Sequence, residues 1–215
     1  MTAPPSDQTN ESSKAVRPTR IQSENQQKIL AAALTLFSRY GFRGTTVDQI
    51  ATQAEMSKAN ILYYFKRKND IYVAVLEKLL ENWLEPLGDM NADGDPEEEL
   101  WKYIQAKLKL SAQSPEASRL FATEIIQGAP LIKPFLENEL RELVEDRCRV
   151  LQHWIDQGRL VNAPPLHMLF LIWAATQHYA DFAIQVDALT PNMTGQVFTD
   201  AETTLRKVLL NGLLS

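Results

Sequence analysis

Residues 45–68, TTVDQIATQAEMSKANILYYFKRK, decide the fold of this chain. Thr45 or Thr46, and Ser57, are residue types that cap helix amino ends, and short runs with apolar residues at helical spacing follow them. The sequence therefore predicts two short helices joined by a tight turn. The second, over 58–65, carries two tyrosines and a phenylalanine and runs directly into the three cations of residues 66–68. A buried helix does not favour these cations and a solvated one does not favour these aromatic rings, so the segment needs a partner that accepts both.

Longer helices flank this pair. The stretch SENQQKILAAALTLFSRYG begins with a capping residue type at Ser23 and ends at Gly41, and it predicts the first helix. A second long helix is predicted from Lys68 to a stop at Pro86, with large apolar residues recurring on one side. A helix, two short crossed helices and a long helix form the helix-turn-helix arrangement of DNA-binding domains.

The rest of the chain is also predicted to be helical. After a loop at GDMNADGDP, apolar residues recur at helical spacing in five further segments: 96–112, 115–127, 130–157, 164–187 and 197–214. No run alternates apolar and polar residues for long enough to predict a strand. The expected fold is therefore all-α, with about nine helices.

Charge is divided unevenly along the chain. The 215 residues together have a net charge of −5, which by itself does not favour a nucleic-acid binder. Residues 1–68, however, hold ten Lys and Arg against five Asp and Glu, whereas the remainder holds twelve against twenty-two. This asymmetry indicates a basic head, suited to a polyanion, on an acidic body.

Cysteine content and hydropathy bear on the compartment. The single cysteine, Cys148, excludes an intramolecular disulfide and a cysteine-rich zinc site. The amino-terminal residues lack the apolar core of a signal peptide, and the most apolar run, MLFLIWAA, is far shorter than the roughly 20 residues that span a bilayer. A soluble cytoplasmic protein without a membrane partner is expected.

Residues 31–72, AAALTLFSRYGFRGTTVDQIATQAEMSKANILYYFKRKNDIY, resemble the DNA-binding domain of the TetR family of transcriptional repressors. The resemblance rests on the Gly-Phe-x-Gly-Thr turn, the Ile-Ala pair and the Tyr-Phe-x-x-Lys ending, and departs from the family at Leu62, where many members carry a tyrosine. It implies a DNA-binding domain over 23–68 and a ligand-binding and dimerisation domain over 69–215. Residues 1–22 are polar, contain three prolines and are predicted to be a flexible arm.

Two further segments, SRLFATEIIQGAP (118–130) and IWAATQHYADFA (172–183), resemble a uracil-responsive member of that family. The implied function is a repressor that uracil or thymine releases from its operator, with control of pyrimidine catabolism. Two alternatives stay open. The effector is a different small molecule, such as a drug, a fatty acid or an amino-acid derivative, or the chain is a helical interaction protein that binds no DNA.

The predicted DNA contacts follow from what a major groove requires. A helix inserted there needs short polar side chains at its amino end, for base edges, and donors on its flanks, for phosphates. The helix that follows also presents backbone N–H groups to phosphate at its start. The predicted DNA-binding residues are Thr46, Lys58, Ala59, Asn60, Tyr63, Tyr64 and Lys68. The alternative for the tyrosines is packing within the small domain.

The predicted ligand contacts centre on Gln177 and Trp173, one helical turn apart. A glutamine amide offers a donor and an acceptor that pair with a pyrimidine dione, and an indole ring offers a stacking surface. From helices that surround the cavity in the family, the resemblance adds Trp83, Tyr103, Lys107 and Phe121. The alternative for each aromatic residue is core packing, and for Gln177 it is a hydrogen bond across helices or a solvated position.

The 164–187 helix has two apolar faces at 100 degrees per residue. One face carries Leu169, Trp173, Thr176, Gln177 and Ala180, and the opposite face carries Leu171, Ala175, His178 and Phe182. The first face suits a ligand pocket and the second suits a partner subunit. Because members of the resembled family dimerise through their last two helices, we expect a homodimer that binds a palindromic operator.

Enzyme functions find no support in the sequence. The three histidines show no metal-ligand spacing, and the chain contains neither a glycine-rich phosphate loop nor a Ser or Cys in a nucleophile motif. The chain is therefore predicted to be no enzyme and to need no cofactor or metal.

Overall fold

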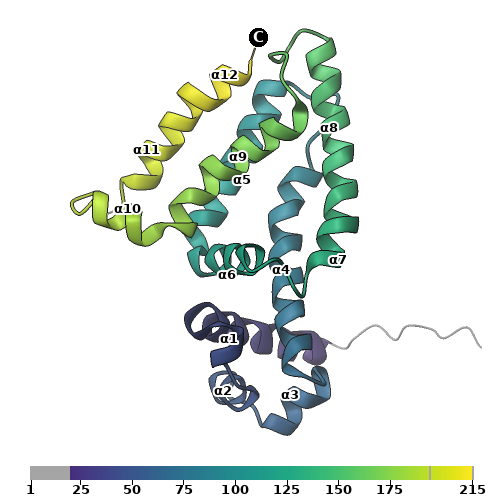
Figure 1. The fold of residues 1–215 in the computed structure, drawn as a ribbon, viewed down its shortest axis with the longest axis vertical. Helices are drawn as coiled ribbons and strands as arrows, with labels where there is room; N and C mark the ends of the chain where they lie inside the picture. The colour runs from purple at the N-terminus through teal and green to yellow at the C-terminus, as the bar shows by residue number, and fades with distance from the viewer. Residues whose placement is uncertain (1–19, 194, 215) are drawn as a thin grey trace, which may run out of the picture.

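Residues 20–193 and 195–214 are described by a computed structural model, and within these ranges the fold is all-α, as predicted. The head contains three helices and the beginning of a fourth (Figure 1): α1 (Arg20–Gly44), α2 (Val47–Gln53), α3 (Lys58–Tyr64) and α4 (Lys68–Gly88). The body contains the remaining helices, of which η1 and η2 are π-helical: α5 (Pro96–Gln113), α6 (Pro115–Ile126), α7 (Lys133–Phe135), η1 (Leu136–Leu140), α8 (Arg141–Asp156), α9 (Pro165–Asp181), α10 (Ala183–Leu189), α11 (Val197–Thr204), η2 (Leu205–Leu210) and α12 (Asn211–Leu213).

The two short helices of the head begin where their capping residues predict. Gln49 N donates to Thr46 Oγ1 at 3.2 Å while Thr46 N donates to Gln49 Oε1 at 2.8 Å, which completes a capping box at the start of α2. At the start of α3, Asn60 N donates to Ser57 Oγ at 3.1 Å. These local bonds fix both ends of the turn that sets α3 across α2.

Several helix boundaries in the head differ from the prediction. Because α1 begins at Arg20, Ser23 lies inside the helix and is not its cap. Gly41 does interrupt the helix, with φ 70° and ψ 173°, although the helical assignment resumes and ends at Gly44. The predicted stop at Pro86 is wrong, since α4 continues to Gly88; a proline in the last turn costs little of the helical hydrogen bonding.

Two boundaries in the body also differ. The segment predicted over 130–157 begins only at Lys133, because residues 130–132 form a turn after Ala129, whose φ is 53°. The segment predicted over 164–187 is two helices, which meet at Phe182. Most of the predicted flexible arm lies outside the described residues.

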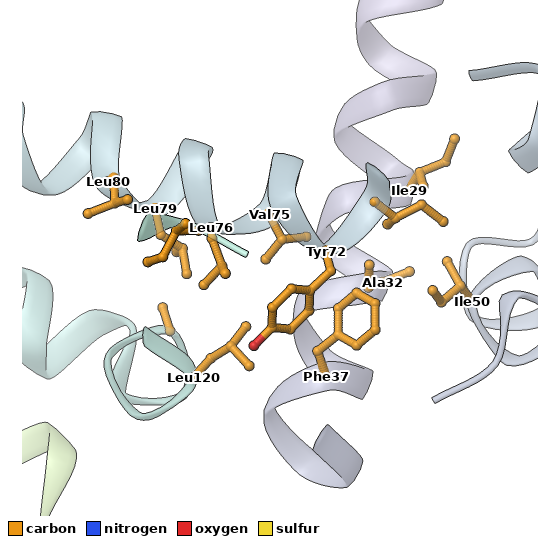
Figure 2. Packing of buried hydrophobic residues seen from close by; sticks show 14 of the residues in the cluster. Ile29, Ala32, Phe37, Ile50, Tyr72, Val75, Leu76, Leu79, Leu80 and Leu120 are labelled. Carbon is orange, nitrogen blue, oxygen red and sulfur yellow. The ribbon is translucent and has the colours of Figure 1, made fainter. Parts of the chain in front are cut away.

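The first of two hydrophobic cores joins the head to α6. Figure 2 shows Tyr72 of α4 beside Phe37 of α1, with a ring-centroid distance of 4.9 Å, in the cluster that includes Leu120 of α6. The same core follows α4 as far as Trp83. The second core is built by α5, α8, α9, α11 and η2, and α4 reaches it only near its carboxyl end, with Leu87. The boundary between the cores thus lies inside the predicted ligand-binding domain.

Two buried hydrogen bonds to Glu124 connect α4 and the segment after α6 to the end of α6. Tyr72 OH donates to Glu124 Oε2 at 3.1 Å, and Leu131 N donates to Glu124 Oε1 at 3.0 Å. Tyr72 and Glu124 are each 3% exposed. Because an unpaired buried polar group is costly, these bonds hold the end of α6 at a fixed place on α4.

The backbone at Gly41 supplies the first testable prediction. Its φ and ψ lie in a region that is essentially restricted to glycine, although a Cβ there would meet nothing within 4 Å. We expect Gly41→Ala to lower the free energy of unfolding by about 1–3 kcal/mol through backbone strain alone. Gly88→Ala in α4, which also has free space around it, is the matched control and should be neutral or stabilising. Equal stabilities of the two variants in urea titrations would contradict this assignment.

Candidate DNA-binding surface and effector site

Helix α3, the predicted recognition helix, is buried on one side, and its polar amino end lies at the surface. Ile61 is fully buried in the first core, whereas Lys58 and Ala59 are exposed and Asn60 is half-buried. Tyr63 is 71% exposed, which leaves its hydroxyl available to a phosphate. The amino end therefore presents one cation and one amide, Lys58 and Asn60, with the small Ala59 between them, and hydrogen-bonding groups are what a helix that reads base edges requires.

Other predicted DNA contacts already have partners within the protein. Lys58 Nζ pairs with Asp48 Oδ2 at 2.9 Å in an exposed ion pair between α3 and α2, which a phosphate can readily replace. Tyr64 OH accepts from Asn25 Nδ2 at 2.9 Å, and its ring packs against the first core. Tyr64 thus has the packing role that was the alternative for the two tyrosines, whereas Tyr63 only touches the Tyr64 ring edge-on, at 5.1 Å between centroids, and stays mostly exposed.

Lys68, which was predicted to contact a DNA phosphate, instead binds backbone carbonyl groups of the protein. Its Nζ donates to Phe42 O at 2.8 Å and to Thr45 O at 2.9 Å, and it lies 4.4 Å from the centroid of the Phe42 ring. The half-buried ammonium therefore closes the turn between α1 and α2. A phosphate contact would break both bonds, so we expect a structural role for this side chain. The neighbouring cations Lys66 and Arg67 are exposed.

Lys107 is the centre of the predicted ligand residues. Its Nζ lies 4.7 Å from the centroid of the Trp83 ring and donates to Gln177 Oε1 at 3.4 Å, which is a long bond. Trp83 in turn packs edge-on against Phe121 at 5.6 Å between centroids. Four helices, α4, α5, α6 and α9, each contribute one residue to this group.

The remaining two predicted ligand residues form a second contact beside the first. Trp173 Nε1 donates to Tyr103 OH at 2.6 Å. Tyr103 lies one helical turn before Lys107 on α5, and Trp173 lies one turn before Gln177 on α9. Since Trp83 belongs to the first core and Tyr103 to the second, the six residues meet at the boundary between the two cores.

A cavity of about 410 Å³ opens between α6 and α9 at this boundary. Its size lies in the range of small-molecule sites. Two of the predicted ligand residues line it, and seven residues that sequence reasoning did not select complete the wall: Phe121, Gln177, Arg119, Ala122, Thr123, Ile125, Ile126, Asp181 and Phe182.

Asp181 is the most informative residue that sequence reasoning missed. It lies one turn after Gln177 on α9, which is the one signal in the sequence that indicates a shared face. Its Oδ1 accepts a hydrogen bond from Ser118 Oγ of α6. Burial raises the pKa of Asp181, and this rise is countered by the Ser118 hydrogen bond and by the charge of Lys107.

The predicted subunit face of α9 is exposed. Leu171 is 52% and Phe182 54% exposed, while Ala175 is half-buried. Phe182 also stacks on His178, at 5.1 Å between ring centroids, and lines the cavity. Substitution of Phe182 would therefore alter both sites, and Leu171 is the cleaner probe of the subunit face.

In the described part of the chain, no helix combines the length and apolar character needed to cross a membrane.

Replacement of Lys68 separates its two possible roles. Lys68→Met leaves two backbone carbonyls without their charged donor, so we expect it to destabilise the protein by about 1–3 kcal/mol. Lys66→Met, at the exposed neighbouring cation, is the control and should change stability by less than about 0.5 kcal/mol. Thermal unfolding measures this difference. If Lys68→Met has wild-type stability but a salt slope of DNA binding reduced by about one, the phosphate role is right and the structural role is wrong.

Lys107 carries a buried charge that costs stability. Lys107 is 4% exposed, and burial lowers its pKa from 10.5 to about 8, so the protonated side chain destabilises the folded state by roughly 3 kcal/mol. We expect Lys107→Met, which keeps the side-chain volume, to raise the thermal midpoint at pH 7. The gain should be complete below pH 8 and vanish as the pH approaches 10.5, where the lysine of the unfolded chain also deprotonates. An unchanged midpoint at pH 7, alongside the exposed control Lys109→Met, would show that the charge carries no cost.

Two family models match successive parts of the chain. Residues 29–75 match the family model described as bacterial regulatory proteins, tetR family, and residues 76–215 match the model of the YcdC-like protein, C-terminal region. The HTH-type transcriptional regulator RutR of Escherichia coli (strain K12) is 40% identical over 196 residues, which are 90% of this chain and 92% of that protein. The HTH-type transcriptional repressor NicS of Pseudomonas putida is 30% identical over 136 residues, or 62% of this chain and 63% of that one.

Solved structures confirm the fold. A regulator from Clostridium perfringens superposes with a TM-score of 0.72 at 23% identity and covers 87% of this chain and 99% of its own. The ketosteroid transcriptional regulator KstR2 of Mycobacterium tuberculosis has a TM-score of 0.66 at 16% identity, with 88% and 95% covered. The curated relatives are transcriptional regulators and not enzymes. The chain belongs to the tetR family of bacterial regulatory proteins and is a DNA-binding transcriptional regulator.

Proposed function

We propose that this regulator is a homodimeric repressor, which uracil or thymine releases from a palindromic operator and which thereby controls pyrimidine catabolism. The similarity to RutR supports this proposal, and the observation that carries it is the contact between Lys107 and Gln177 among aromatic rings. A pyrimidine dione has carbonyl acceptors and N–H donors on one plane. The ammonium and the amide supply partners for both kinds of group, while Trp83 and Phe121 supply flat surfaces for the ring.

The bond between Lys107 and Gln177 leaves the ammonium able to bind a ligand as well, because an ammonium has three N–H donors. At 3.4 Å it is long for a charge-assisted hydrogen bond, which prefers about 2.8 Å. A ring carbonyl within reach of the ammonium would form a shorter bond and pair a buried charge that is otherwise costly. The ligand would therefore gain binding energy from groups that the free protein leaves poorly satisfied.

A different effector class has one observation in its favour. A buried cation next to apolar and aromatic residues also suits a carboxylate with an apolar tail, such as a fatty acid or an amino-acid derivative. Titration of the protein with uracil, thymine and octanoate separates the two classes. Tighter binding of octanoate than of either pyrimidine would favour this second class.

The division into two cores suggests how a ligand reaches the DNA-binding head. Trp83 and Phe121 belong to the core that includes the head, whereas Tyr103 and Trp173 belong to the body core. A ligand held between these residues favours one spacing of the two cores. Because Tyr72 and Glu124 fix α6 to α4, a shift of α6 moves the head with it. Release from DNA requires tighter effector binding to the spacing that DNA disfavours, since equal affinity shifts nothing.

Gln177 provides a direct test of the effector assignment. Gln177→Leu keeps most of the volume but removes the amide, so the ring would lose its paired contact and bind about tenfold to a hundredfold more weakly. We expect this variant to bind operator normally and to need correspondingly more uracil for release. Gln113→Leu, at an exposed position near the end of α5, is the control. Calorimetry with uracil and fluorescence anisotropy with operator DNA measure the two properties. Absence of uracil binding by the wild type, or undiminished binding by a folded Gln177→Leu, would refute the pyrimidine effector.

The subunit face is tested apart from the ligand cavity. Leu171→Asp places a charge in the middle of the exposed apolar face of α9, so we expect a monomer that loses operator binding. Gln113→Asp, at an exposed position on α5 outside the last two helices, is the control for an added charge and should stay dimeric. Sedimentation velocity that finds Leu171→Asp as dimeric as the wild type would contradict the assignment of this face.

A further inference from the structure

Asp181 is a half-buried carboxylate in the wall of the cavity, and the paired contact proposed above makes no use of it. The inference that follows rests on the proposed function and concerns how the same site selects its effector. Ser118, which is fully buried, donates to Asp181 Oδ1 and fixes the carboxylate in place. A carboxylate has two oxygens, each able to accept further hydrogen bonds, so this bond leaves it an acceptor for a ligand.

The orientation of the Gln177 side-chain amide follows from its hydrogen-bond partner, Lys107. A lysine ammonium has only donors, so the group that faces Lys107 Nζ is necessarily the amide oxygen, as the structure has it. The amide nitrogen, a donor, is therefore the end of Gln177 that faces away from Lys107. Gln177 and Asp181 lie one turn apart on α9 and both line the cavity. The wall thus offers a donor beside an acceptor.

Charges of both signs at this wall select against charged ligands, because Arg119 and Asp181 both line it. A carboxylate ligand that reaches Arg119 also meets Asp181, and an ammonium ligand that reaches Asp181 also meets Arg119. A neutral ring with an N–H next to a carbonyl satisfies Asp181 and Gln177 without a charge conflict. Uracil and thymine present this edge, whereas a fatty acid does not.

We infer that Asp181 accepts a hydrogen bond from the ring N–H of the effector while Gln177 donates to the adjacent carbonyl, so that the site selects a neutral ring carrying this pair of groups. Asp181 is then a specificity-determining residue. Ser118 acts through it as a positioning residue, because its hydroxyl holds the carboxylate towards the cavity.

Calorimetry with uracil and 1,3-dimethyluracil tests this inference, because methylation removes both ring N–H groups and keeps the carbonyls. The wild type should bind uracil about tenfold or more tightly than the dimethyl compound. In Asp181→Ala, affinity for uracil should fall about tenfold or more and affinity for 1,3-dimethyluracil should hardly change, so the ratio between them collapses. Asp187→Ala, at an exposed aspartate of α10, should keep the wild-type ratio.

Ser118→Ala is a second variant for the case that Asp181→Ala does not fold, and it should reduce the ratio in the same direction by a smaller factor. Circular dichroism verifies the fold of each variant. If the wild type binds uracil but folded Asp181→Ala and Ser118→Ala keep its ratio, the role of Asp181 is wrong while the proposed function stands. If the wild type binds the dimethyl compound as tightly as uracil, the selection for an N–H is wrong. Absence of uracil binding by the wild type would overturn both the inference and the proposed function.

Discussion

One helix, α4, contributes side chains to both hydrophobic cores, and the arrangement of the molecule depends on this sharing. From Ile71 to Trp83 its buried residues belong to the core that contains the head and α6, and Leu87 belongs to the core of the body. The head is therefore not an independent domain joined by a linker. It is packed as one unit with α6, whose place between α4 and α9 can be followed in Figure 1. This unit meets α5 and α9 along the boundary where the residues of the proposed effector site lie. A core is close-packed and transmits displacement, so a change at this boundary reaches the head.

The same boundary contains the buried charges of the body. Lys107 and Asp181 each bond a neutral partner, Gln177 and Ser118 respectively, rather than having a direct ion pair. Burial disfavours the charged form of both groups, as the directions of their pKa shifts show. An apolar pair of similar volume would pack there at lower cost. Asp181 lines the cavity, and Lys107 contacts Gln177 in its wall. Retention of poorly compensated charges at such a place is typical of a binding site, where groups that destabilise the folded protein are available to a ligand.

Features set by local interactions could be predicted from the sequence, whereas features set by tertiary packing could not. The caps at Thr46 and Ser57 depend on bonds within four residues, so the pattern of the head was sufficient to place α2 and α3. The role of Lys68 was not predictable, because its acceptors Phe42 O and Thr45 O come near it only when the turn between α1 and α2 has folded. Pairing between Ser118 and Asp181 likewise depends on how α6 lies against α9, which no periodicity within one helix reveals.

Effector binding at the boundary between the cores is expected to move the heads of the dimer. Double electron–electron resonance between spin labels at Gln53→Cys, an exposed position on α2, measures the separation of the two heads in the dimer, with Cys148→Ser removing the native thiol. Labelled protein is measured without ligand and at a uracil concentration that calorimetry shows to be saturating. We expect the mean distance between the two labels, and the width of its distribution, to differ between the ligand-free and the uracil-saturated protein. Identical distance distributions with the site fully occupied would contradict it.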